Sequence, residues 1–298
     1  MNILITGCNG QLGTELQLLE KEYPQHTWIN TDVKLSDSPD GLPQQQLDIT
    51  NQLAVNQFVA QNQVDGIINC AAYTAVDKAE SDRQMATALN TEAPAYLAAA
   101  IEKRGGWMIH ISTDYVFNGS GSAPWPADGA ALSPLNVYGR SKLAGEKAAA
   151  EALNALYTVR TAWLFGVHGG SFVRAMLRLG AAKKELTVVD DQFGSPTYTR
   201  DLARLLADMA CAEAYGVYHA AGGGGYVSRY AFAEEIFRQA GMPVRLIPAH
   251  TADFPGDPVP RPLNGRLELS KLAAKGFIPL PGWKDALSRC LKEMEYHG

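Results

Sequence analysis

The sequence predicts an α/β fold: a doubly wound parallel sheet with a second, smaller α/β lobe. In the first half, short apolar runs at residues 2–6, 27–31, 66–70, 107–112 and 157–164 alternate with helical patterns near 11–22, 51–62, 84–104 and 138–153. This alternation is typical of parallel sheets, because the connection between two parallel strands is usually a helix. The second half differs, since it contains more Gly, Pro and loops.

Helical stretches in the second half are expected near 171–183, 199–213, 228–240 and 283–295, with an extended piece at 186–189. We therefore expect two domains, residues 1–164 and residues 165–298, with an approximate boundary across which segments can interleave.

Composition excludes several classes of function. The chain has 298 residues, 46% of them hydrophobic, and a formal net charge of −5 without a basic stripe, so nucleic acid is not an expected partner. No apolar run reaches the roughly 18 residues of a membrane helix, and no signal peptide precedes the first strand, so we expect a cytoplasmic protein. The cysteines Cys8, Cys70, Cys211 and Cys290 are far apart and form no metal-binding motif.

The first strand runs directly into a glycine-rich turn. Gly7, Gly10 and Gly13 follow the apolar run Asn2-Ile-Leu-Ile-Thr6 and precede a helical pattern. Glycines at these positions permit a tight turn and a close approach of the backbone to a pyrophosphate, while the helix N-terminus offers free N–H groups. Strand, glycine turn and helix in this order predict a dinucleotide-binding Rossmann domain.

An acidic residue ends the second predicted strand. Asp32 lies about 20 residues after the glycines, where a carboxylate can accept hydrogen bonds from an adenosine ribose. A carboxylate there favours NAD over NADP, because it repels a 2′-phosphate. Lys34 can weaken that repulsion, so the choice between NADH and NADPH stays open.

Tyr138 and Lys142 form the expected acid-base unit. The two are four residues apart within a predicted helix and therefore share one face. Free Tyr has a pKa of about 10. We expect the neighbouring Lys cation to lower the pKa of the phenol and to prepare it for proton transfer at a carbonyl or carbinol.

Other polar and small residues follow predicted strands or sit in loops. Ser112, Thr113 and Asp114 end the strand at 107–112, where a hydroxyl can polarise a substrate carbonyl. Ala71 and Ala72 leave room for a flat ligand, and Asp48 can accept from an adenine amino group. Arg261 and Arg266 lie in a Pro-bounded loop and suit a diphosphate, because guanidinium groups pair well with phosphate oxygens.

Together these blocks resemble the extended short-chain dehydrogenases/reductases and, more narrowly, the dTDP-4-dehydrorhamnose reductase family. The blocks are the glycine turn and residues 75–80, 112–117, 133–147, 191–197 and 261–267. They occur in the same order from residue 2 to beyond 290. The resemblance implies an NAD(P)H-dependent reduction at C4 of dTDP-4-dehydro-L-rhamnose, which gives dTDP-L-rhamnose for cell-surface polysaccharide.

The resemblance also implies roles for single residues. Tyr138 would donate the proton, Lys142 would bind nicotinamide ribose, and Thr113 would hydrogen-bond the reacting carbonyl. The predicted cofactor site consists of Gly7, Gly10, Gln11, Leu12, Gly13, Asp32, Asp48, Ile49, Ala71, Ala72 and Tyr73, together with Tyr138 and Lys142. The predicted substrate site consists of Thr113, Asp114, Trp163, Arg261 and Arg266.

The same resemblance implies an assembly and a metal. Some members bind Mg²⁺ at a dimer contact through acidic side chains. The resemblance therefore implies a homodimer, and Glu15, Asp201 and Glu293 occupy the positions that match the magnesium ligands. Asp stands where others have Glu, and this shorter carboxylate slightly favours the alternative, which is dispersed surface acids without a metal.

Two alternatives remain. The first is a redox-neutral nucleotide-sugar epimerase or dehydratase; dehydratases usually show Thr-Asp-Glu after the fifth strand, whereas Tyr115 follows Asp114 here. The second is a non-catalytic regulatory subunit on the same fold, which the presence of Tyr138, Lys142 and Thr113 disfavours.

Overall fold

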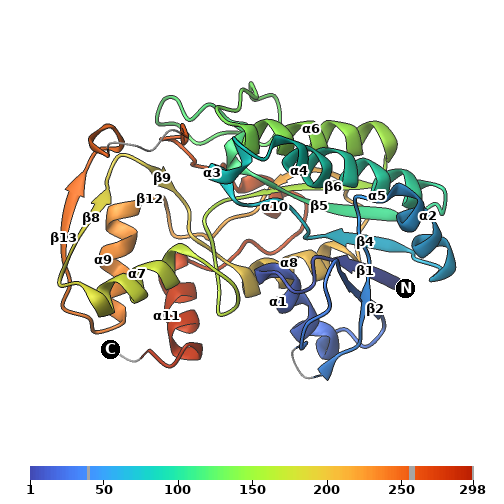
Figure 1. Cartoon of the computed structure of the whole chain (residues 1–298), viewed down its shortest axis with the longest axis horizontal. Helices are drawn as coiled ribbons and strands as arrows, with labels where there is room; N and C mark the ends of the chain where they lie inside the picture. The colour runs from blue at the N-terminus through green and yellow to red at the C-terminus, as the bar shows by residue number, and fades with distance from the viewer. Residues whose placement is uncertain (39–40, 255–258, 297–298) are drawn as a thin grey trace.

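The computed structural model describes residues 1–38, 41–254 and 259–296. Within these ranges, seven parallel strands form the central sheet, in the order β11-β6-β5-β4-β1-β2-β3. The strands are β1 (Asn2–Thr6), β2 (Thr27–Asp32), β3 (Gln44–Gln46), β4 (Gly66–Asn69), β5 (Trp107–Thr113), β6 (Leu156–Thr161) and β11 (Gly216–His219). The predicted doubly wound α/β fold is confirmed (Figure 1).

The strand order reverses between β1 and β4, which are neighbours in the sheet although β2 and β3 come between them in the chain. Chain connections leave this point in opposite directions, so a crevice opens beyond the carboxyl ends of the two strands. In open α/β sheets, ligands bind at this kind of switch point.

Helices cover both faces of the sheet (Figure 1). On one face, α1 (Gln11–Leu19) packs against α8 (Thr199–Met209); on the other lie α2 (Gln52–Gln61), α5 (Ala93–Glu102) and α6 (Val137–Ala152). Successive side chains of a strand point to opposite faces, and β1 follows this rule. Ile3 and Ile5 belong to the core beneath α1 and α8, and Leu4 belongs to the core beneath α5.

A short π-helical turn interrupts the predicted helix at 84–104. The segment consists of α4 (Arg83–Thr87), the π-helical η3 (Ala88–Glu92) and α5. Asn90 lies in the π turn, where its side chain accepts from the backbone N–H of Tyr73 at 2.8 Å and donates to Ser141 Oγ at 3.0 Å. Asn90 therefore ties the loop after β4, which continues into α3 (Val76–Ala79), to helix α6.

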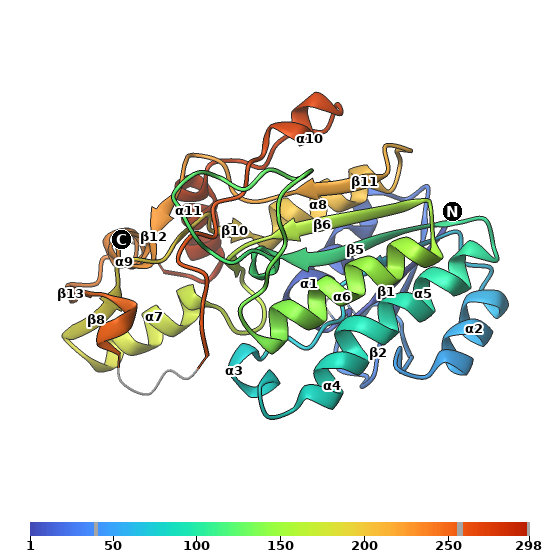
Figure 2. The ribbon, with the colours of Figure 1, turned by 90° about the horizontal axis from the view of Figure 1, so that it is seen from above.

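The second lobe has its own hydrophobic core, formed chiefly by α7 (Phe172–Ala182), α9 (Arg229–Gln239) and α11 (Trp283–Glu293) (Figure 2). Strand β8 (Glu185–Val189) pairs in parallel with β13 (Arg245–Ala249). Two short pairs join β7 (Leu164–Phe165) to β10 (Thr197–Tyr198) and β9 (Phe193–Gly194) to β12 (Val227–Ser228). The remaining short elements are η1 (Glu20–Glu22), η4 (Asp114–Val116), η5 (Thr251–Asp253) and α10 (Ser270–Ala274).

Segments of the second half also complete the central sheet. Strand β11 pairs with β6, and helix α8 packs on α1. Both β11 and α8 come after residue 164 in the chain. The division into residues 1–164 and 165–298 stays a prediction, with interleaving at these two elements. No helix in the described ranges is long and apolar enough to cross a bilayer.

A buried ion pair fastens α6 to the sheet. Arg160 of β6 donates to Glu146 of α6 through Nη2 at 2.7 Å and Nε at 2.9 Å, and the two side chains are 4% and 7% exposed. Ser112 of β5 donates its hydroxyl proton to the same carboxylate. Two strands and one helix therefore meet at a single charged group.

Replacing Arg160 with Met should lower the free energy of unfolding by about 3–5 kcal/mol, because the change leaves a buried carboxylate without its partner. Urea denaturation measures the change. Arg204→Met is the matched control, since Arg204 pairs with Glu22 where both side chains are more than half exposed; it should cost about 1 kcal/mol or less. Equal losses for the two variants would contradict the account.

Candidate active site

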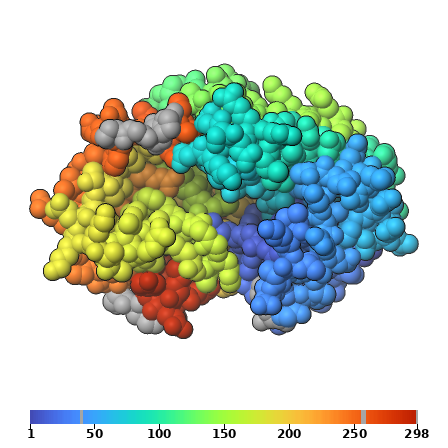
Figure 3. Space-filling view, in the orientation of Figure 1, coloured from blue at the N-terminus to red at the C-terminus, as the bar shows by residue number. Residues whose placement is uncertain are grey.

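A cleft of about 770 Å³ lies beyond the carboxyl ends of β1, β4, β5 and β6 (Figure 3). Its walls come from several segments of the central domain and from the second lobe. The lining comprises residues 7–13 in part, Asp32, Val33, 70–76 in part, Leu89, 111–115, Tyr138, Lys142, 161–164, Gly169, Gly170 and Arg229. A separate hollow of about 910 Å³ on the second lobe contains none of the predicted site residues.

The glycine turn approaches the end of β4 so closely that side chains would not fit. Gly7 has a φ of +68°, and a Cβ there would lie 2.8 Å from the backbone of Ala71. A Cβ on Gly13 would lie 2.3 Å from the carbonyl oxygen of Gly7. Helix α1 begins immediately after Gly10 with no side-chain cap, so its first N–H groups face the cleft unpaired by a cap. This bare backbone cradle fits a pyrophosphate.

The predicted cofactor residues divide into two groups. Gly7, Gly10, Gln11, Leu12, Gly13, Asp32, Ala71, Ala72, Tyr138 and Lys142 line the cleft. Asp48, Ile49 and Tyr73 do not. Asp48 is exposed and accepts from Thr50, Ile49 is buried in the core beneath α5, and the Tyr73 hydroxyl donates to Asp82.

Asp32 is already engaged by the backbone around it. Its carboxylate accepts from the N–H of Asn9 at 3.1 Å and from that of Lys34 at 3.5 Å. Gln11 reaches from α1 to the second lobe, where its side-chain amide donates to the carbonyl of Gly170. The two halves of the molecule therefore touch at the position of the expected pyrophosphate.

Helix α6 carries the expected acid-base residues on one face. Asn136 caps the helix by accepting from the N–H of Gly139 at 2.8 Å. Tyr138 and Lys142 then follow one turn apart, and both line the cleft. The Tyr138 phenol interacts with the side chain of Thr113, which ends β5.

The pKa of Tyr138 is raised, whereas the sequence analysis expected the Lys142 cation to lower it. Burial raises the pKa of Tyr138 above its usual value of 10, with the negative charges of Asp114 and Tyr115 adding to the rise, and the Thr113 hydrogen bond only partly opposes it. Lys142 does not offset this rise. At neutral pH the phenol is therefore protonated, which is the form that donates a proton.

Lys142 is held by the neighbouring strand. Its Nζ donates to the carbonyl oxygen of Ile111 at 2.6 Å. Burial lowers the pKa of Lys142 to about 8, and the carboxylate of Glu146 one turn further along α6 opposes that decrease. The ammonium is therefore charged at neutral pH and faces the cleft.

The end of β5 supplies the polar groups opposite Tyr138. Thr113 Oγ1 donates to Asp114 Oδ1 at 3.1 Å and accepts from the N–H of Tyr115 at 3.2 Å. Asp114 is 3% exposed, its Oδ2 has no partner within the described residues, and burial raises its pKa to about 7. Ser112 lines the cleft but uses its hydroxyl on Glu146, so it serves the buried ion pair.

The predicted substrate residues also divide. Trp163 lines the cleft with a φ of +50°, a strained backbone for a bulky residue, and its ring packs against Gly194. Arg261 and Arg266 do not line it: Arg261 pairs with Asp77 at 2.7 Å, and Arg266 lies over the Phe193 ring at 4.2 Å. Arg229, which the sequence analysis did not single out, does line the cleft.

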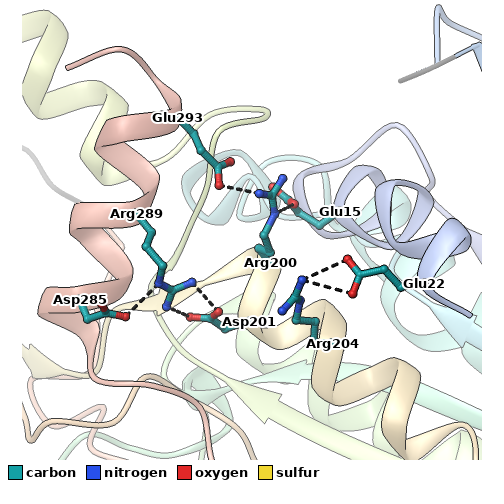
Figure 4. A network of polar contacts seen from close by, with 8 residues as sticks. All are labelled: Glu15, Glu22, Arg200, Asp201, Arg204, Asp285, Arg289 and Glu293. Carbon is teal, nitrogen blue, oxygen red and sulfur yellow. Dashed lines mark hydrogen bonds and ion pairs between the residues drawn. The ribbon is translucent and has the colours of Figure 1, made fainter. Parts of the chain in front are cut away.

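The carboxylates proposed for magnesium are occupied by arginines (Figure 4). Arg200 donates to both Glu15 and Glu293, and Arg289 binds both oxygens of Asp201, at 2.8 and 2.6 Å. No group of three potential metal ligands occurs in the described part of the chain. These residues therefore do not fit a divalent cation, and the sequence-based expectation disagrees with the arrangement because it did not foresee the guanidinium groups.

Comparison with known proteins identifies the family. The family model described as RmlD substrate binding domain matches residues 1–296. A dTDP-4-dehydrorhamnose reductase of Streptomyces griseus is 41% identical over 96% of this chain and 91% of that protein. The chain belongs to the dTDP-4-dehydrorhamnose reductase family.

Solved structures of this family agree with the fold throughout. The crystal structure of a dTDP-4-dehydrorhamnose reductase ortholog from Clostridium acetobutylicum has a TM-score of 0.91 and 40% identity, covering 99% of this chain and 100% of that one. The dTDP-4-dehydrorhamnose reductase from Bacillus anthracis in complex with NADP has a TM-score of 0.89 and 37% identity, covering 98% of this chain and 99% of that one. The resemblance inferred from the motifs is confirmed at the level of family.

The pKa of Asp114 predicts a pH-dependent stability. Because burial raises this pKa from 3.8 to about 7, the folded protein binds the proton more tightly than the unfolded chain between these values. The contribution of this carboxyl to stability therefore falls as pH rises through that window. Asp114→Asn removes the ionisation, so relative to wild type it should be more stable at pH 8 than at pH 5.

Urea unfolding of both proteins at the two pH values measures this difference. Asp128→Asn, at an exposed carboxyl paired with Lys271, is the control. The stability difference between Asp114→Asn and wild type should therefore change with pH. The same difference at both pH values would show that the pKa of Asp114 does not lie in this range.

The arginine pairing also predicts independence from magnesium. Dialysis against EDTA should leave both turnover and the thermal midpoint unchanged in the wild type. In Arg200→Gln, which uncovers Glu15 and Glu293, added Mg²⁺ should raise the thermal midpoint. Loss of wild-type activity or stability in EDTA, restored by Mg²⁺, would contradict this arrangement.

Proposed function

We propose that the chain catalyses the NAD(P)H-dependent reduction of dTDP-4-dehydro-L-rhamnose at C4 to dTDP-L-rhamnose, for cell-surface polysaccharide. The observation that carries the proposal is the pairing of Tyr138 on α6 with Thr113 at the end of β5, inside the cleft that the glycine turn opens. A protonated phenol and a hydroxyl that line the same cleft suit a carbonyl that becomes an alcohol.

The cofactor, when bound, supplies the hydride. The chain's own residues manage the oxygen and its proton. Thr113 has one hydroxyl proton, which it donates to Asp114 in this structure. With substrate bound, Thr113 turns this proton to the carbonyl oxygen and orients it, and Tyr138 delivers its own proton to that oxygen as negative charge develops.

Lys142 is placed to bind the cofactor. Its Nζ is fixed by the Ile111 carbonyl, which leaves two ammonium protons for hydroxyls of the nicotinamide ribose. We keep the homodimer and the cytoplasmic location as predictions that rest on the family resemblance.

The reductase and the redox-neutral alternative differ in stoichiometry. Purified protein with dTDP-4-dehydro-L-rhamnose should oxidise one NADPH or NADH for each dTDP-L-rhamnose formed, as followed by absorbance and by chromatography of the sugar nucleotide. Turnover of the sugar without loss of the reduced cofactor would instead support an epimerase or dehydratase.

Tyr138→Phe should lower kcat by about 10²–10⁴-fold, which is the usual contribution of a positioned general acid. The dissociation constant of NADPH should change by less than about threefold, because the ring and its packing stay. Steady-state kinetics and fluorescence titration measure the two quantities. Tyr115→Phe removes a second phenol from the same cleft, where the two rings lie 5.5 Å apart edge to face. This change should cost much less than Tyr138→Phe. Unchanged turnover in Tyr138→Phe would show that another group donates the proton.

A further inference from the structure

Arg229 is the one arginine in the described part of the chain that lines the cleft. It is the first residue of α9 and therefore comes from the second lobe, opposite the cofactor-binding turn. Nothing in the sequence marks it, because a lone Arg at the start of a helix is common on protein surfaces. Its position is nevertheless inside the cleft that holds Tyr138 and Thr113.

The guanidinium of Arg229 is positioned by aromatic rings. Its central carbon lies 3.6 Å from the centroid of the Trp163 ring and 5.0 Å from that of Phe172. An arginine stacked on a Trp face keeps the edge of its fork available for hydrogen bonds. No residue in the described ranges accepts a hydrogen bond from this guanidinium or forms an ion pair with it.

Partial burial makes this charge costly where no hydrogen-bonded partner offsets it. It lowers the pKa of Arg229 to about 10, while the acidic groups of Tyr115 and Asp114 only partly offset the effect. The guanidinium is still a cation at neutral pH. Arg229 is half-buried, and a partly desolvated cation without a hydrogen-bonded anion is stabilised when an anionic ligand arrives.

Arg261 and Arg266, which the sequence analysis favoured for a diphosphate, are less suitable than Arg229 because other groups already bind them. The Arg261 guanidinium donates to both carboxylate oxygens of Asp77, at 2.7 and 2.9 Å. Arg266 donates to Asn264 Oδ1 at 3.0 Å and packs on Phe193. Neither lines the cleft, whereas Arg229 does.

We propose that Arg229 binds the diphosphate of the nucleotide-sugar substrate and that the Trp163 ring holds its fork in position. The planar fork can donate two parallel hydrogen bonds to phosphate oxygens. This assignment rests on the proposed function for the class of substrate. It makes Arg229 a substrate-binding residue and Trp163 its positioning residue.

Calorimetric titration with dTDP tests the assignment without any catalytic step. Arg229→Gln should weaken dTDP binding by at least tenfold, as expected for the loss of charge-assisted hydrogen bonds. Arg229→Lys keeps the charge but loses the fork, so its affinity should lie between those of wild type and Arg229→Gln. The dissociation constant of NADPH should change by less than about threefold in both variants.

Arg238→Gln is the matched control, because Arg238 lies on the same helix but pairs with Glu235 on the surface. It should bind dTDP like the wild type. Thermal unfolding of each variant shows whether the second lobe is intact.

Unchanged dTDP affinity in Arg229→Gln would overturn the inference, and so would an equal loss of dTDP and NADPH affinity. A loss of dTDP affinity in Arg261→Gln or Arg266→Gln but not in Arg229→Gln would assign the diphosphate site to the loop at 261–266 instead.

The proposed function can fail independently of this inference. If the wild type binds dTDP through Arg229 but does not reduce dTDP-4-dehydro-L-rhamnose, the inference stands and the reaction is another one. If the wild type reduces the sugar and Arg229→Gln binds dTDP normally, only the inference fails.

Discussion

The register of helix α6 along strand β5 is the constraint on which the active site depends. A Cβ on Gly139 would lie 2.3 Å from the carbonyl oxygen of Tyr115, and one on Gly145 would lie 1.9 Å from that of Asn90, so the helix lies as close to its neighbours as backbone permits. Glu146 then fixes the helix along its axis through Ser112 and Arg160. A shift of one residue would turn the phenol and the ammonium away from the cleft.

This close packing also explains the electrostatics of the site. Lys142 is only 2% exposed and Asp114 3%, so each side chain has lost most of its contact with water. Burial is the largest cause of the pKa shift in both groups, and it favours the neutral form of each. The second lobe adds a half-buried charge with Arg229. A cleft with charges held in this way is prepared for a polar, anionic ligand that replaces the lost water.

Much of the fold and part of the site follow from local patterns in the sequence. Apolar runs predict β1, β2, β4, β5 and β6. The glycine turn predicts that the cofactor binds between β1 and α1, and the Tyr138–Lys142 spacing predicts that the proton donor lies on α6. Strand β3 is Gln-Gln-Gln and carries no apolar signal, because it lies at the sheet edge. The rise of the Tyr138 pKa and the pairing of Glu15 with Arg200 depend on burial and on contacts between residues distant in the chain. Such contacts, like the position of Arg229, are set by tertiary packing.

A crystal structure of the protein with NADP⁺ and dTDP-L-rhamnose tests the central claim most directly. The account predicts that the C4 hydroxyl of the sugar lies within hydrogen-bond distance of both Tyr138 Oη and Thr113 Oγ1, with Lys142 Nζ at the nicotinamide ribose. A sugar whose C4 hydroxyl lies beyond the reach of Tyr138, with both ligands bound in the cleft, would contradict it.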